Sequence, residues 1–319
     1  MAITSSTLIQ EYVPLADKNW FKTGGPARYF AEPQSAQEFQ QALNFAQKKQ
    51  LPIFLLGEGA NILISDEGFD GLVIHSKLKI ITITYLDENS ALITAEAGVT
   101  MPDLIQFCLE NNLSGLEEFS GIPGTVGGSV YINLHYFQFL LSQFLYEAEV
   151  VEKASGILHT VSNSWFNFGY NSSTLQENNH YLVSATFKLK KINDLEKAFA
   201  QGRSIEIIRH RASRYPAKNT CGSFFRNFHD NEVTLISNGK KLIFVAYYLD
   251  KIDIKGVLRH GDAVVSYQHA NMIVNQGAAT TTDIINVARE MQQRVYDAYG
   301  IMPQPECRLI GFKEYPLLR

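Results

Sequence analysis

The chain has few cysteines, and their spacing excludes the usual cysteine-built sites. There are three, Cys108, Cys221 and Cys307, and none belongs to a C-x-x-C pair. Disulfide-stapled secreted domains and structural zinc sites need paired, closely spaced cysteines. We therefore expect reduced thiols, a reducing compartment and no bound metal.

Long apolar runs and an excess of positive charge are also missing. The most apolar stretch, residues 136–146, is interrupted by Gln138, Ser142 and Gln143 and falls well short of the roughly 20 residues that span a bilayer. No basic segment followed by an apolar run marks a signal peptide. Lys and Arg number 28 against 32 Asp and Glu, a net charge of −4, which gives no basic field for nucleic acid. We expect a cytoplasmic protein that binds neither membranes nor nucleic acid and, without a coiled-coil seam in the sequence, a monomer.

Glycine, by contrast, is concentrated in two segments. Residues 120–133 read S-G-I-P-G-T-V-G-G-S-V-Y-I-N, and residues 57–61 upstream read G-E-G-A-N. Glycine lacks a Cβ atom, so such backbone can turn sharply and approach a large ligand closely. Pro123 fixes one φ angle inside the longer segment. The pair predicts two walls around one extended ligand, with ordinary turns between strands as the alternative.

The first part of the chain predicts a strand–helix–strand unit. Residues 27–31 favour a strand, and Ser35 and Glu38 form a capping box for a helix that ends near residue 49. Residues 53–56 favour a buried strand, which the first glycine segment follows directly. In open α/β sheets this carboxyl end of a strand is where ligands bind. Residues 72–75 close this first lobe.

The remaining sequence of 319 residues predicts two further α+β units, in line with two or three domains for this length. The second has a hairpin at 79–85 and 91–96, a helix at 100–112, strands at 148–152, 158–161 and 181–190, and a helix capped by Asp194 that reaches about residue 211. The third begins near residue 212 and has a loop at 221–227, a helix at 282–299 closed by Gly300, and a last strand at 305–311.

Seven pieces of sequence, none specific alone, occur in a characteristic order. They are Asn19 with T-G-G-P-A at 23–27, G-E-G-A-N at 57–61, G-I-P-G-T-V-G-G at 121–128, F-G-Y at 168–170, G-S-F-F-R-N at 222–227, H-A-N at 269–271 and P-E at 305–306. Together they resemble the UDP-N-acetylenolpyruvoylglucosamine reductase family over nearly the whole chain. The short span from Tyr170 to Cys221 and the C-G-S form of the loop at 221–223 are similar to its shorter, type II subclass.

The resemblance implies an α+β fold in which two lobes of vanillyl-alcohol-oxidase type bind FAD and a C-terminal α+β domain binds the substrate. The implied FAD lobes are residues 1–78 and residues 79–205 with 304–319, and the implied substrate domain is residues 206–303. A pyrophosphate is met best by closely spaced backbone N–H groups, which glycine-rich backbone presents. The implied cofactor contacts are Gly57, Gly59, Ala60, Asn61, Gly121, Gly124, Thr125, Gly127, Gly128 and Ser129.

The family's reaction implies NADPH as reductant and a UDP-sugar enolpyruvyl ether as the small-molecule substrate. NADPH reduces the flavin, the flavin passes hydride to C3 of the enolpyruvyl group, and C2 is protonated. This chemistry needs a placed proton donor and stabilisation of the charge that builds on the carboxylate. By match to the motifs, Ser223 is the acid and Glu306 its carboxyl partner, with a plain turn and a solvated glutamate as the ordinary alternatives. The implied substrate contacts are Tyr170, Arg214, Arg226 and Asn227, of which Arg214 and Asn227 are equally open to a surface role.

Two departures from the family pattern fall in the implied pocket. The motif F-G-Y-R-x-S reads F-G-Y-N-S-S here, so the catalytic position of the arginine is held by Asn171, which donates hydrogen bonds but carries no charge. Residues 134–138, L-H-Y-F-Q, replace small residues that the family places beside the flavin. His135, Arg226 and Arg308 are the candidates to replace the missing cation. Two alternatives therefore stay open, a flavoenzyme acting on another substrate and a flavin-binding protein without turnover.

Overall fold

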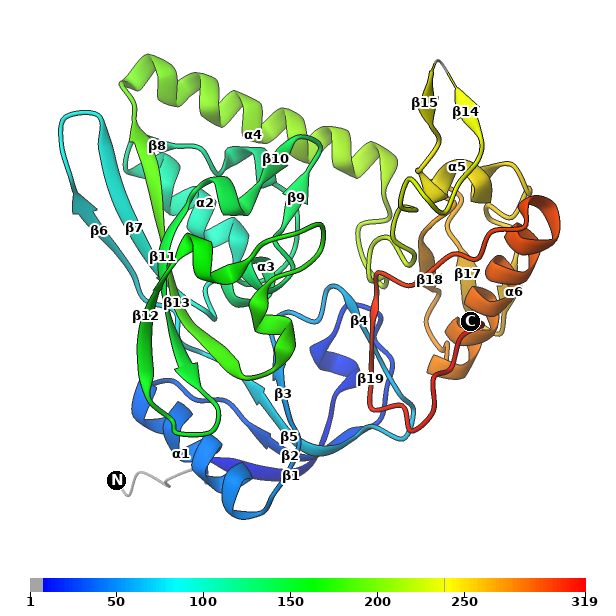
Figure 1. The fold of residues 1–319 in the computed structure, drawn as a ribbon, viewed down its shortest axis with the longest axis horizontal. Coiled ribbons are helices and arrows are strands. Elements are labelled where there is room, and N and C mark those ends of the chain that lie inside the picture. Colours follow the sequence, from blue (N-terminus) through cyan, green and yellow to red (C-terminus); the bar gives the residue numbers. More distant parts are fainter. Residues whose placement is uncertain (1–7, 238) are drawn as a thin grey trace. The chain divides into compact units, whose positions relative to one another are not determined.

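The computed structural model describes residues 8–237 and 239–319, which form two compact units (Figure 1). Unit 1 comprises residues 8–11, Tyr29–Glu58 and Gly71–Arg211, and unit 2 comprises Tyr12–Arg28, Gly59–Asp70 and Ala212–Arg319. The boundary falls within strands β1 (Ile9–Pro14), β2 (Pro26–Ala31) and β5 (Phe69–His75). The domain boundaries expected from the sequence stay a prediction.

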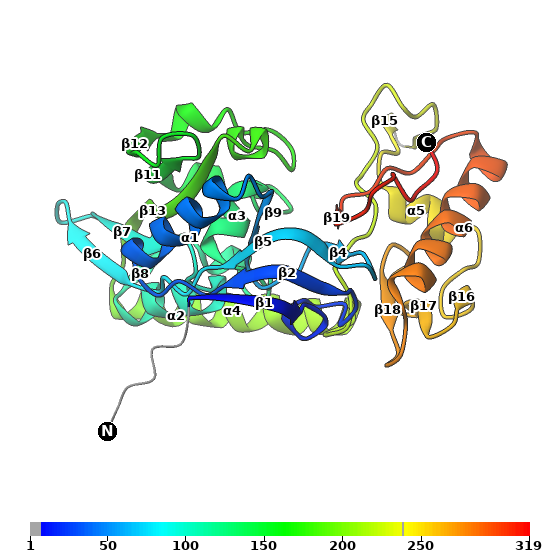
Figure 2. The same cartoon turned by 90° about the horizontal axis from the view of Figure 1, so that it is seen from below.

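Unit 1 has two hydrophobic cores. The first lies between helix α1 (Ala36–Lys48) and a sheet with the strand order β1-β2-β5-β3 (Figure 2). β3 (Ile53–Leu56) runs parallel to β5, with Leu56 opposite His75. The residues that α1 buries are Phe39, Ala42, Leu43 and Ala46, one face of the helix. The predicted strand–helix–strand unit is confirmed.

The start of α1 is only partly as predicted. The Ser35 hydroxyl accepts a hydrogen bond from the Glu38 N–H, 3.2 Å, as a cap should. The Glu38 carboxylate, however, accepts from the N–H of Gln34 rather than of Ser35. The reciprocal half of the predicted capping box is therefore wrong by one residue.

The second core of unit 1 is built on an antiparallel sheet with the order β12-β11-β13-β7-β6, and β8 pairs with β13. The predicted hairpin and three strands are confirmed. The strands are β6 (Ile81–Tyr85), β7 (Ser90–Glu96), β8 (Leu113–Ser114), β11 (Leu145–Glu152), β12 (Leu158–Ser162) and β13 (His180–Lys191). The accompanying elements are α2 (Met101–Glu110), α3 (Val126–Tyr131), α4 (Asp194–Arg214) and the small hairpin β9 (His135–Tyr136) and β10 (Phe139–Leu140).

Two local predictions in unit 1 need correction. The second glycine segment is not a loop throughout, because α3 begins inside it with Thr125 as its N-cap. The predicted N-cap Asp194 lies inside α4, and Asn193 is the cap. The Asn193 side chain accepts from the Glu196 N–H, and the Glu196 carboxylate accepts from the Asn193 N–H, both at 3.0 Å.

Unit 2 contains a third core, in which α6 (Thr281–Tyr299) packs on a sheet of β16 (Arg259–His260), β17 (Ala263–Val265) and β18 (Ile273–Asn275). Gly300 ends α6 in the left-handed region at φ 69°, as predicted. The predicted last strand is β19 (Arg308–Ile310), which runs parallel to β4 (Ile62–Ile64). The remaining elements are α5 (Val245–Asp250) and the hairpin β14 (Ile236–Ser237) and β15 (Lys240–Lys241).

Candidate functional site

In unit 1 the two glycine segments touch each other at two points. The Gly124 N–H donates to the Glu58 carboxylate, 2.8 Å. A Cβ atom on Gly57 would lie 2.6 Å from the Thr125 hydroxyl, so only glycine allows this approach. Glu58 and Thr125 thus join segments that are far apart in the sequence, as the prediction of two walls around one ligand requires.

The structure changes the reason why these glycines suit a large ligand. The N–H groups of residues 127, 128 and 129 already donate within the chain, to the Ala97 carbonyl, the Thr125 hydroxyl and the Thr125 carbonyl. They are therefore not a row of free donors for a pyrophosphate. A Cβ on Gly124 or Gly128 would instead meet only one atom within 4 Å, at 3.7 and 3.6 Å. The backbone at both glycines is open to close approach, which fits a flat or extended cofactor.

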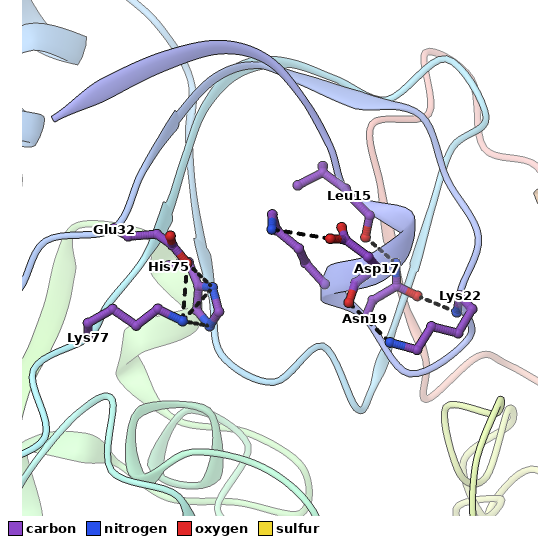
Figure 3. Close-up of polar contacts among 8 residues, drawn as sticks. Leu15, Asp17, Asn19, Lys22, Glu32, His75 and Lys77 are labelled. Atoms are coloured by element: carbon purple, nitrogen blue, oxygen red, sulfur yellow. Dashed lines mark hydrogen bonds and ion pairs between the residues drawn. The ribbon is translucent and has the colours of Figure 1, made fainter. Parts of the chain in front are cut away.

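A polar cluster that the sequence did not reveal lies at the same edge of the first sheet. His75 pairs with Leu56, the residue before Gly57. Figure 3 shows Glu32, His75 and Lys77 together, with the Glu32 carboxylate 3.2 Å from His75 Nδ1 and 3.1 Å from Lys77 Nζ. Lys77 follows the end of β5 by two residues, so the sequence feature that could have indicated this cluster is a cation directly after a predicted strand. We assign this cluster to the candidate cofactor-binding edge.

The second half of the first glycine segment belongs to unit 2, where Asn19 organises it. Asn19 is buried and donates to the Leu15 carbonyl, and its side-chain oxygen accepts from the Lys22 N–H (Figure 3). It also donates to the Thr23 carbonyl. Gly59 has φ 67°, and a Cβ there would lie 2.7 Å from the Asn19 Cα. Asn19 therefore fixes the turn against which Gly59 packs. The neighbouring residues Ala60 and Asn61 follow that turn into β4.

The candidate catalytic residue Asn171 has a buried side chain without hydrogen-bond partners among the described residues. Both its amide nitrogen and its amide oxygen are buried without a hydrogen-bond partner. Its backbone is left-handed, φ 53°, and its carbonyl accepts from the Gln176 side chain, 2.8 Å. A buried amide without partners costs free energy that a bound polar ligand would recover. The role of Asn171 toward a ligand stays a prediction.

The side chains of the bulky segment 134–138 lie in different surroundings. Leu134 and Tyr136 are buried in the second core, and Phe137 is 66% exposed in the turn of the β9–β10 hairpin. His135 alone lies beside the candidate site, with its ring 5.0 Å from that of Tyr170. Burial lowers the pKa of His135, so it is a neutral group rather than a cation near neutral pH.

In unit 2 the segments that carry Ser223 and Glu306 are direct neighbours. The N–H groups of Glu306 and Cys307 donate to the Phe224 carbonyl, 2.9 and 3.2 Å. Buried Asn271 holds the serine loop from the other side: its side chain accepts from the Phe225 N–H and donates to the Phe225 carbonyl. The backbone therefore brings the two predicted catalytic residues together.

The three cationic and polar side chains predicted to bind substrate have contacts within unit 2. Arg226 makes a two-point ion pair with Glu232 at 2.7 Å, and this pair lowers the pKa of Glu232 to about 2. The Asn227 side chain accepts from the Val245 N–H at the start of α5, 3.3 Å. Arg214 lies 5.8 Å from the ring of its neighbour Tyr215. Their role toward a substrate stays a prediction.

Within residues 8–237 and 239–319, no group of three His, Cys, Asp or Glu side chains is placed to hold a metal ion. Over the same ranges, no helix has the length and apolar character of a membrane span. All three cysteines are free and buried.

Comparison with known proteins gives two family matches and full-length relatives. The FAD binding domain model matches residues 27–162, and the model of the UDP-N-acetylenolpyruvoylglucosamine reductase C-terminal domain matches residues 214–310. A protein named UDP-N-acetylenolpyruvoylglucosamine reductase from Synechococcus sp. (strain RCC307) is 34% identical, over 98% of this chain and 97% of its own. One of the same name from Acaryochloris marina (strain MBIC 11017) is 33% identical over 95% and 93%.

A solved structure agrees with these matches. The crystal structure of UDP-N-acetylenolpyruvylglucosamine reductase from Thermus caldophilus has a TM-score of 0.75 and 28% identity, covering 95% of this chain and 99% of that one. The predicted α+β fold, with an FAD-binding part and a C-terminal domain, is confirmed. The predicted FAD cofactor is confirmed by the same domain match, and the open backbone at Gly124 and Gly128 fits it. The chain belongs to the UDP-N-acetylenolpyruvoylglucosamine reductase family.

Proposed function

We propose that this protein is an FAD-dependent reductase that uses NADPH to reduce the enolpyruvyl group of UDP-N-acetylglucosamine enolpyruvate, giving UDP-N-acetylmuramate for peptidoglycan synthesis. The observation that carries the proposal is the juxtaposition of the Ser223 and Glu306 segments through hydrogen bonds to Phe224. It is supported by the names of relatives that match over nearly the full chain. A UDP-sugar and NADPH are cytoplasmic small molecules, so we expect the protein to act in the cytoplasm.

The cofactor would be held by unit 1 residues that leave backbone exposed. When bound, FAD supplies hydride transfer, from the nicotinamide nucleotide to C3 of the enolpyruvyl ether. Gly124 and Gly128 allow it to approach the backbone, and Glu58 fixes the relative position of the two glycine segments. Lys77 contributes positive charge at the same edge, partly neutralised by Glu32.

Ser223 would give its hydroxyl proton to C2 of the substrate. A serine hydroxyl is a weak acid, so it works only when it is tightly placed and its conjugate base is stabilised. The Asn271 side chain bonds both backbone groups of Phe225, two residues after Ser223, and so would place the Ser223 hydroxyl. Glu306, on the segment before β19 that lies beside Phe224, would orient the hydroxyl or the substrate carboxylate.

Asn171 would bind the substrate carboxylate through its unpartnered amide nitrogen. The negative charge that builds there during hydride transfer would meet a dipole and not a full charge. Loss of one preorganised electrostatic group costs on the order of 10²–10³ in rate, so we expect a slow enzyme.

The test is substrate-dependent oxidation of NADPH by the FAD-loaded protein. Steady consumption should begin only when UDP-N-acetylglucosamine enolpyruvate is added. Ser223→Ala should lower kcat by about 10²–10⁴, the usual contribution of a general acid, while reduction of the flavin by NADPH continues unchanged. Ser237→Ala, an exposed serine in β14, is the matched control. Equal turnover of Ser223→Ala and the parent protein would remove Ser223 from the mechanism.

Two observations favour a second function. Asn171 is a neutral residue where the family motif has a cation, and His135, a candidate to replace that cation, is neutral as well. The protein would then keep FAD and NADPH but act on a substrate without a carboxylate. Flavin that NADPH reduces, but that the enolpyruvyl substrate neither binds nor reoxidises, would favour this alternative. A protein that binds FAD and is not reduced by NADPH would instead be one without turnover.

A further inference from the structure

The turn that carries Asn171 is closed by its own backbone. The Gly169 N–H donates to the Ser172 carbonyl, 3.1 Å, and the Ser172 N–H donates to the Gly169 carbonyl, 3.4 Å. Asn171 is the third residue of this four-residue turn, with φ 53°, and a positive φ at the third position is a feature of type II turns. These bonds join the two ends of the turn and leave its tip, where Tyr170 is 45% exposed, to be held from outside.

The side chain of Gln176 holds the tip of this turn. Its amide nitrogen donates to the Asn171 carbonyl, 2.8 Å, and to the Tyr131 carbonyl, 3.1 Å. A primary amide has two N–H donors, so both are used in these two bonds. The Ser173 hydroxyl donates to the same Tyr131 carbonyl, 2.7 Å. Gln176 lies in the short 3₁₀ helix Thr174–Glu177 that follows the turn, and it thereby ties the turn to the last residue of α3.

Asn133, just beyond the end of α3, holds the other side of the turn. It is buried, its amide nitrogen donates to the Gly169 carbonyl, 3.1 Å, and its side-chain oxygen accepts from the Ser142 N–H, 3.1 Å. The turn is therefore attached on both sides to the C-terminal end of α3. At the other end of the helix, Gly124 precedes the N-cap and Gly128 lies in the first turns, where the backbone is open to the candidate cofactor. One short helix thus connects the candidate cofactor backbone with this turn.

We propose that Gln176 is a positioning residue for the reaction, because by fixing the turn to α3 it holds the Asn171 amide in one place relative to the candidate cofactor glycines. The inference rests on the proposed function, in which Asn171 binds the substrate carboxylate. Both N–H donors of Gln176 are used within the chain, so it acts through Asn171 and not on the substrate. A group that stabilises developing charge is effective when its position is fixed before the reaction, since no free energy is then spent on reorienting it.

Hydrogen exchange measured by mass spectrometry tests the attachment without any turnover. Gln176→Met keeps the length of the side chain and removes both donors. In the FAD-loaded protein we expect the peptide with residues 168–173 to exchange about 10-fold faster than in the parent protein, because the turn opens more often. Gln106→Met, which removes an exposed glutamine of α2 that bonds Glu110, is the matched control and should leave this peptide unchanged. Equal exchange of the peptide in Gln176→Met and the parent protein would overturn the proposal.

A double-mutant cycle tests whether Gln176 acts through Asn171. Gln176→Met should lower kcat by about 10-fold with little change in KM, since a misplaced amide is felt mainly in the transition state. In the Asn171→Gly background the same substitution should change kcat by less than about 2-fold, because no amide is left to position. An equal loss in both backgrounds would show that Gln176 supports only the fold and would contradict the proposal. A parent protein that does not turn over the substrate contradicts the proposed function, whereas the exchange experiment decides the attachment of the turn independently.

Discussion

The backbone conformation at Asn171 tolerates glycine, and the environment of its side chain makes the loss of the amide favourable for stability. The left-handed backbone, φ 53°, suits asparagine and glycine better than other residues. Its two buried, unpartnered amide atoms are a cost to the folded protein. A group that lowers the stability of the folded protein is retained where it binds a ligand. Functional sites commonly reduce stability in this way.

Asn171→Gly should therefore raise stability and lower activity. Removing buried polar atoms without partners should stabilise the protein by about 1–3 kcal/mol, because folding no longer has to desolvate them without forming hydrogen bonds in return. Loss of the Asn171 amide donor should reduce kcat/KM by about 10²-fold. Urea unfolding and steady-state kinetics measure the two effects on the same preparation.

Asn178→Gly is the matched control, because Asn178 is also left-handed, φ 59°, but exposed and hydrogen bonded to the Gln176 carbonyl. It should change activity little. If Asn171→Gly is less stable than the parent protein, the amide has partners in the folded state and its assignment as a ligand-binding group is wrong.

At the scale of elements, the contact between the two glycine segments depends on one carboxylate. Glu58 follows β3 and accepts from Gly124, which precedes α3. A hydrogen bond to a charged group contributes more than one between neutral groups. We therefore expect Glu58 to be a positioning residue for the candidate FAD site.

Glu58→Ala should weaken FAD binding by about 10–100-fold, because a charge-assisted hydrogen bond of about 1.5–3 kcal/mol no longer holds the Gly124 segment. Glu58→Gln should keep most of the affinity, since its side-chain oxygen still accepts. Titration of apoprotein with FAD, followed by flavin fluorescence, measures both. Glu88→Ala, in the exposed turn between β6 and β7, is the control, and equal affinity in Glu58→Ala would refute the role.

The same elements show how far the sequence can predict this molecule. Strands β2, β3 and β13 and helix α6 follow local alternation, apolar spacing and caps, which are all properties of neighbouring residues. The Glu58–Gly124 contact and the Glu32–His75–Lys77 cluster join residues far apart in the chain, so no local pattern predicts them. Motif order predicts Ser223 and Glu306 as partners for another reason, because resemblance carries tertiary information that composition lacks; the segments that carry them are neighbours in unit 2.

At the scale of the whole molecule, acid should destabilise unit 2 through one partly buried histidine. Burial, together with repulsion from Arg214, lowers the pKa of His269 from 6.5 to about 4. Its Nδ1 accepts from the Asn271 N–H, 3.3 Å, and so needs the neutral ring. Between these two pKa values the unfolded chain binds a proton that the folded chain does not. Stability should therefore fall as the pH drops from about 6.5 to about 4, by up to about 3 kcal/mol.

A second loss should follow at lower pH and is separable from the first. The Glu232 carboxylate, with its pKa lowered to about 2 by Arg226, stabilises the fold above pH 4.5 and loses that contribution as the pH falls through 2. The chain has two tryptophans, and Trp20 belongs to unit 2, so Trp165→Phe leaves fluorescence that reports that unit alone. In this background His269→Gln should flatten urea stability between pH 6.5 and 4 while the Glu232 step persists. An unaltered slope in His269→Gln would assign the upper transition to other groups.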